Sequence, residues 1–119
     1  MRSDRDRLLD ILEAIKRIDK YADIDKADFE TNELIQTWMV FNIQIVGEAA
    51  AGISDPVRNK YPKVPWRSIA SMCNALVHAY FKVDLDEVWS VIKNDLPVLE
   101  APYPISSRAR VSNPARVMT

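Results

Sequence analysis

The sequence predicts an all-α fold, an antiparallel four-helix bundle that has five helices if a short connector helix is counted. Apolar residues recur at three- and four-residue intervals through four separate stretches, which is the period of amphipathic helices. Only two glycines occur in 119 residues, whereas a β-rich fold with many tight turns normally uses more. Hydrophobic residues make up 48% of the chain, enough for one core. We therefore expect one domain over residues 1–100, followed by a flexible tail over 101–119.

The first helix is expected from about Asp4 to Tyr21, because its apolar residues fall on one face. These residues are Leu8, Ile11, Leu12, Ile15, Ile18 and Ala22. Residues 23–28 are expected to form a loop. The second helix should run from Phe29 or Asn32 to Ile53, with Gly52 as a stop signal. Its apolar face is so broad that more than one neighbour is expected, and a second chain could be one of them.

The third and fourth helices follow a connector over residues 53–64, in which one short helical turn could span Ser54 to Lys60. Pro65 is well placed to open the third helix, which should run from Trp66 to about Tyr80. Asp84 should cap the fourth helix, with Glu87 three residues on as in a capping box. Pro97 should end or kink that helix.

Bulk properties exclude several classes of protein. The formal net charge is −1, so any RNA-binding surface must be a local patch. With Cys73 as the only cysteine, no intrachain disulfide can form, which suits a reducing cytoplasm. Charged residues interrupt the N-terminal stretch, unlike a signal peptide, and no run is long enough to span a membrane.

The segment most suggestive of chemistry is 73–80, which contains His78, the only histidine of the chain. A lone histidine in a predicted helix is more often structural than catalytic, and with Cys73 as the only other soft ligand it cannot build a zinc site. Cys73 itself is, on spacing alone, better explained as a small buried helix residue. Asn74 and His78 are four residues apart and therefore share a helix face, with Tyr80 close by.

In this context the chain resembles the HepT toxins, a family of HEPN-domain proteins. The strongest part of the resemblance is the run Asn-Ala-Leu-Val-His-Ala-Tyr-Phe-Lys-Val-Asp at 74–84, followed by Val88-Trp89. Three further segments resemble the family, namely Pro65-Trp66-Arg67-Ser68-Ile69, Ile45-Val46-Gly47-Glu48-Ala49 and Asp95-Leu96-Pro97. The resemblance covers roughly residues 4 to 100.

The resemblance implies a dimeric helical bundle and an endoribonuclease that needs neither metal nor other cofactor. The RNA supplies its own nucleophile, the 2′-hydroxyl, at a composite site to which both chains contribute. On this basis His78 is the general acid/base, Asn74 a polar positioning residue and Tyr80 the tyrosine of the family motif. A histidine that titrates near neutrality suits the proton transfer.

The sequence departs from the family at the motif arginine, where this chain has Cys73. The nearest upstream arginine is Arg67, which is outside the spacing of the motif and is only a weak candidate for RNA binding. A thiol cannot replace a guanidinium as a phosphate clamp, so we expect impaired cleavage. Two explanations stay open: natural drift toward a binding role, or a substitution that relieved toxicity.

The resemblance also implies a partner, the minimal nucleotidyltransferase that serves as antitoxin in type VII-like toxin–antitoxin pairs. In such pairs the antitoxin transfers AMP to the motif tyrosine, which here is Tyr80. An alternative is a non-catalytic HEPN dimer that binds the nucleotidyltransferase. A third interpretation is a helical interaction domain whose polar motif only specifies dimerisation.

Overall fold

The computed structural model describes residues 2–77 and 84–100, and within these ranges every regular element is helical. In chain order the elements are α1 (Asp4–Asp19), α2 (Lys26–Thr31), α3 (Glu33–Gly52), α4 (Asp55–Lys60), α5 (Trp66–Val77), α6 (Leu85–Ser90), the π-helical turn η1 (Val91–Asp95) and α7 (Pro97–Glu100). The predicted all-α class is confirmed. The predicted continuation of the third helix to Tyr80 and the predicted tail over 101–119 lie outside the described residues.

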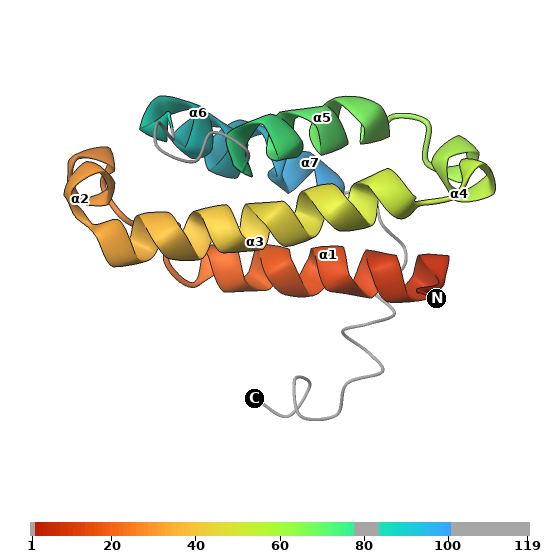
Figure 1. Cartoon of the computed structure of the whole chain (residues 1–119), viewed down its shortest axis with the longest axis horizontal. Helices are drawn as coiled ribbons and strands as arrows, with labels where there is room; N and C mark the ends of the chain where they lie inside the picture. Colours follow the sequence, from red (N-terminus) through yellow and green to blue (C-terminus); the bar gives the residue numbers. More distant parts are fainter. Residues whose placement is uncertain (1, 78–83, 101–119) are drawn as a thin grey trace.

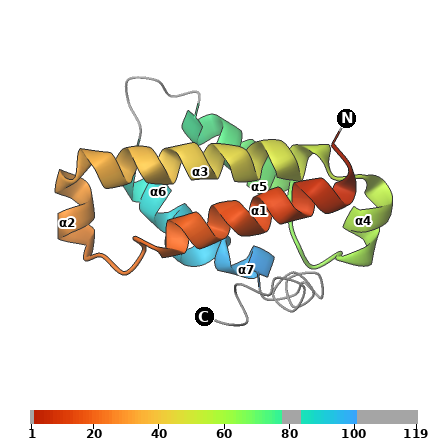
Figure 2. The same cartoon turned by 90° about the horizontal axis from the view of Figure 1, so that it is seen from below.

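Helix α3 is the centre of the bundle. Figure 1 shows it between α1 and α5, with α2 at one of its ends and α4 at the other, and Figure 2 shows the same two ends after a quarter turn. The chain reverses direction between α1 and α3 and again between α3 and α5, so these helices run antiparallel, as predicted. The contacts of α3 with α5 and α1 are the most extensive in the bundle.

The broad apolar face of α3 explains this central place, because the helix must bury residues against two neighbours. From α3 the core takes Met39, Ile43, Val46, Ala49 and Ala50. From α1 it takes Leu8, Ile11, Leu12, Ala14, Ile15 and Ile18, as the period of that stretch predicts.

The N-terminal caps agree with the start signals in the sequence. Ser3 caps α1 in a capping box with Asp6, and the Asn32 side chain accepts a hydrogen bond from the Ile35 amide at 3.0 Å at the start of α3. The Asp84 side chain accepts bonds from the amides of Asp86 and Glu87, which confirms it as the cap of α6.

The predicted loop over residues 23–28 was partly wrong, because α2 begins at Lys26. This short helix is held by tertiary contacts rather than by an amphipathic pattern. Phe29 is fully buried with its ring centroid 5.3 Å from that of Trp89, and Lys26 forms an ion pair with Asp86 at 2.9 Å. Six residues present too few apolar positions for a helical period to be recognised in the sequence.

The end of the bundle also differs from the single fourth helix that was predicted. Helix α6 stops at Ser90, and η1 follows, in which the Leu96 amide donates to the Val91 carbonyl at 2.9 Å. In a regular α-helix the ring of Pro97 would clash with the carbonyl four residues earlier. The wider turn avoids this clash, so Pro97 opens α7 instead of ending the helix. Within the described ranges, no helix is both long and apolar enough to cross a membrane.

Candidate functional site

Helix α5 carries the described part of the motif, and its two faces differ sharply. The buried residues are Trp66, Ile69, Ala70, Cys73 and Leu76, and the exposed residues are Arg67, Ser68, Ser71, Asn74 and Ala75. The structure therefore brings Arg67 and Asn74 to one solvent face, while it turns Cys73 toward the core. His78 and Tyr80 lie outside the described residues, so their roles stay predictions.

The start of α5 is fixed by the connector that precedes it. The indole Nε1 of buried Trp66 donates to the Tyr61 carbonyl at 3.2 Å, and the Val64 amide donates to the same carbonyl at 3.2 Å. The Ile69 amide donates to the Pro65 carbonyl at 3.0 Å, which confirms Pro65 at the helix start. These bonds set the rotation of α5 about its axis and hence the residues that it exposes.

Cys73, which occupies the motif arginine position, is a core residue with no exposed surface. A Cβ placed on Gly47 of α3 would lie 2.6 Å from the Cys73 Cβ, so the missing side chain of Gly47 lets α3 and α5 approach. Burial, together with the negative charge of Asp95, raises the pKa of the Cys73 thiol to about 12. The thiol is therefore protonated and unreactive at neutral pH, in line with its interpretation as a small buried helix residue.

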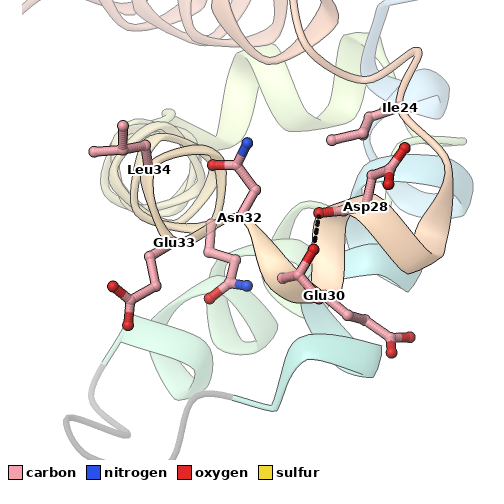
Figure 3. A pocket seen from close by; sticks show the side chains of 8 residues that line it. Ile24, Asp28, Glu30, Asn32, Glu33 and Leu34 are labelled. Carbon is pink, nitrogen blue, oxygen red and sulfur yellow. Dashed lines mark hydrogen bonds between the residues drawn. The ribbon is translucent and has the colours of Figure 1, made fainter.

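The two ends of the bundle carry opposite charge. At the α2 end, residues 23–33 include five acidic side chains against Lys26 alone. Figure 3 shows Asp28, Glu30 and Glu33 around a pocket at the junction of α2 and α3, with Leu34 at its rim. At the α4 end, α4 opens with Asp55, and residues 56–77, which continue from it along α5, include four basic side chains and no acidic one. Because phosphates are anionic, the α4 end suits RNA and the α2 end does not.

Between Glu33 and Glu48, which are both exposed, the solvent face of α3 carries no charge. Phe41 is 52% exposed and Leu34 is 84% exposed, which is unusual for large hydrophobic side chains. Beside Phe41 lies a pocket lined by Gln36, Thr37, Val40, Phe41, Gln44 and Leu85. Residues 34–47 contain no charged side chain. This face, which we call the α3 face, therefore has the character of a surface that another molecule covers.

Comparison with known proteins agrees with this arrangement. The family model described as Ribonuclease HepT-like matches residues 11–102. The chain belongs to the HepT-like ribonuclease family. A Thermococcus cleftensis relative named "Probable ribonuclease HepT" is 36% identical over 103 residues, covering 86% of this chain and 94% of the relative. A Methanocaldococcus jannaschii relative named "Putative RNase MJ1380" is 34% identical over 94 residues, covering 78% of this chain and 86% of the relative. No solved structure matches the chain.

Sequence reasoning found the HepT-like motif helix and missed two features around it. It did not single out Lys60 and Lys63, although the absence of carboxylates over residues 56–77 could have revealed a local basic surface. It also gave no position for the side chain of Glu48, which belongs to one of the segments that resemble the family. The structure places Glu48 at an exposed edge, where its carboxylate accepts a hydrogen bond from Gln44 at 3.2 Å.

Proposed function

We propose that this HepT-like chain is an RNA-cleaving toxin of a type VII-like pair with a minimal nucleotidyltransferase. The observation that carries the proposal is the exposed face of α5, where Asn74 precedes His78 by four residues in a member of a ribonuclease family. The substrate, the nucleotide partner and the single cysteine all suit a cytoplasmic protein.

The proposed reaction needs one general base and one cation. His78 takes the proton of the RNA 2′-hydroxyl, whose oxygen then attacks the adjacent phosphorus and expels the 5′-oxygen, which takes a proton from water as it leaves. The products are a 2′,3′-cyclic phosphate and a 5′-hydroxyl end. Asn74 would position the phosphate or the histidine, and two chains would contribute to one composite site.

Position 73 limits this activity, because a buried thiol cannot stabilise charge on the reacting phosphate. The loss of one such contact costs on the order of 10²–10³-fold in rate. Burial at position 73 disfavours any charge, and the Asp95 carboxylate, which acts on this position electrostatically, offsets part of that cost for a cation. A guanidinium there would gain a counter-charge, although its stem must pass the close contact with Gly47.

The test compares RNA cleavage by the natural chain, by Cys73→Arg and by Cys73→Arg with His78→Ala. We expect Cys73→Arg to cleave about 10²–10³-fold faster than the natural chain and to arrest growth. The added His78→Ala change should abolish the gain. If Cys73→Arg folds with a native circular dichroism spectrum yet neither cleaves RNA nor slows growth, the ribonuclease proposal fails.

We further propose that the α3 face is where two chains meet. In a two-fold contact each surface meets its own copy, so the uncharged stretch over residues 34–47 avoids like-charge repulsion. Leu85, which opens α6 after its cap Asp84, lines the pocket beside Phe41. A contact at this face would therefore include the start of α6.

The dimer is tested with Phe41→Glu, which places charge on the α3 face. A matched control is Val98→Glu on α7, where the natural side chain is 43% exposed. Sedimentation should show a monomer for Phe41→Glu and an unchanged dimer for Val98→Glu. Equal association states for the two variants would exclude the α3 face.

The absence of the motif arginine favours a second function, a non-catalytic dimer that binds the nucleotidyltransferase. In both cases Tyr80 is the proposed acceptor of AMP, whose added phosphates would place negative charge where RNA must bind. Incubation with the transferase and ATP should add AMP to the natural chain and not to Tyr80→Phe, as measured by intact mass. Complex formation without RNA cleavage, even by Cys73→Arg, would favour the binding function.

A further inference from the structure

A row of exposed polar side chains runs from the end of α4 along α5. It consists of Lys60, Lys63, Arg67, Ser71 and Asn74, and we call it the basic edge. All five side chains are exposed, and no acidic residue occurs between positions 56 and 77. The basic edge is therefore a local patch of positive charge on a chain whose formal net charge is −1.

The basic edge is held on a rigid part of the fold. Lys63 lies between Tyr61 and Val64, which are joined by a backbone hydrogen bond of 3.2 Å, and Val64 is buried. Arg67, Ser71 and Asn74 are spaced by four and three residues, so they follow one face of α5. From Arg67 to Asn74 the row covers about 10 Å of helix, the length of about three stacked nucleotides.

Its three cations are available to a ligand. Among the described residues, neither Lys63 nor Arg67 takes part in a hydrogen bond or ion pair, and Lys60 only lies near the Tyr61 ring, 5.8 Å from its centroid. Arg58 on the same helix as Lys60 is different, because its guanidinium donates to the Ala51 carbonyl at 3.1 Å. Lys63 and Arg67 are therefore not held by hydrogen bonds or ion pairs within the described part of the chain.

We propose that the basic edge binds the phosphate backbone of single-stranded RNA and leads it along α5 toward the motif. This inference rests on the proposed ribonuclease function and adds the path of the substrate. The cations contact phosphates, while Ser71 and Asn74 donate hydrogen bonds that carry no strong sequence preference. The acidic α2 end repels the same backbone, so the strand approaches from the α4 end.

The test measures binding of a 2′-O-methyl oligouridylate, which lacks the nucleophile and cannot be cleaved. Binding is compared for the natural chain, for Lys63→Glu with Arg67→Glu, and for Lys20→Glu at the C-terminal cap of α1 as a control at another exposed lysine. On a single strand each phosphate contact contributes about 0.7 to the slope of log affinity against log salt. Losing two contacts should lower this slope by about 1.4 and weaken binding roughly 25-fold at about 0.1 M salt. Lys20→Glu should change binding by less than about threefold, because it alters only the electrostatic potential from a charge remote from the basic edge, which salt screens.

The outcomes separate this inference from the proposed function. If the double variant, folded by circular dichroism, binds as tightly as Lys20→Glu does, the basic edge is not the RNA path. Retention of affinity by Lys63→Arg with Arg67→Lys would support contact through charge. If the natural chain and Cys73→Arg bind the oligonucleotide through the basic edge but cleave no RNA, the inference stands and the ribonuclease function falls.

Discussion

The close contact between α3 and α5 at Gly47 allows one stability prediction to be worked out from the structure. In Gly47→Ala the new Cβ would lie 2.6 Å from the Cys73 Cβ, whereas ordinary contacts begin at 3.4 Å. Because both Cβ atoms are fixed to their backbones, no side-chain rotation relieves the overlap. The two helices must separate by nearly 1 Å, and they form the most extensive contact in the bundle.

The magnitude follows from two opposing effects. Replacing glycine by alanine inside a helix stabilises it by about 1 kcal/mol. Overpacking a close contact typically costs about 1–3 kcal/mol, and here the cost falls near the upper end because neither backbone can move alone. We therefore expect Gly47→Ala to lower the free energy of unfolding by about 1–2 kcal/mol.

Gly52→Ala provides a matched control at the end of the same helix. There the new Cβ would meet the guanidinium of Arg7, the mobile end of a long side chain. That group can move aside, so Gly52→Ala should change stability by less than about 0.5 kcal/mol. Comparing Gly47→Ala with Gly52→Ala therefore distinguishes an overlap between two atoms fixed to their backbones from a contact with a side chain that can move.

Urea unfolding followed by circular dichroism measures both variants, at one protomer concentration because association also contributes to stability. Cys73→Gly removes the Cβ on the other side of the contact, so the double variant with Gly47→Ala should show a favourable coupling of about 1 kcal/mol or more. A Gly47→Ala chain as stable as the natural one, or a coupling near zero, would refute the reasoning.

Three other predictions concern single side chains. In the folded chain Cys73 should react with an alkylating reagent at pH 8 roughly 10³-fold more slowly than after unfolding. The reason is that burial raises the pKa of its thiol from 9.0 to about 12. Rapid labelling of the folded chain would contradict this prediction. Asp4 accepts hydrogen bonds from the Ser54 amide and hydroxyl, which lower its pKa below 3.8. The stability that these bonds add is present above pH 3.8 and is lost as the pH falls through the lowered pKa, so acid unfolding curves of Asp4→Asn and the natural chain should converge at low pH. Buried Asn42 donates to the Trp38 carbonyl, but its Oδ1 has no partner among the described residues. Asn42→Leu should therefore keep or raise the melting temperature, and a marked drop would show that the amide is needed.

Much of the fold could be predicted from local pattern. The period of apolar residues predicted the long helices, and Asp84 and Gly52 marked helix limits that the structure confirms. Each of these signals involves only residues within one or two helical turns of one another, so it can be recognised without knowing the tertiary structure. The family could likewise be recognised from the sequence alone, because the residues from Asn74 to Asp84 that carry the resemblance are consecutive in the chain.

Other features depended on contacts between residues far apart in the sequence. Helix α2 is held by Phe29 against Trp89, and no local pattern announces that contact. The environment of Cys73 depends on Gly47, and the separation of the acidic α2 end from the basic edge depends on how the helices are placed. By itself the sequence determined which long helices form, which face of each is apolar and which family the chain belongs to. Only the tertiary structure decided that α3 and α5 approach closely at Gly47 and Cys73, because this property depends on distances between helices that side-chain packing sets.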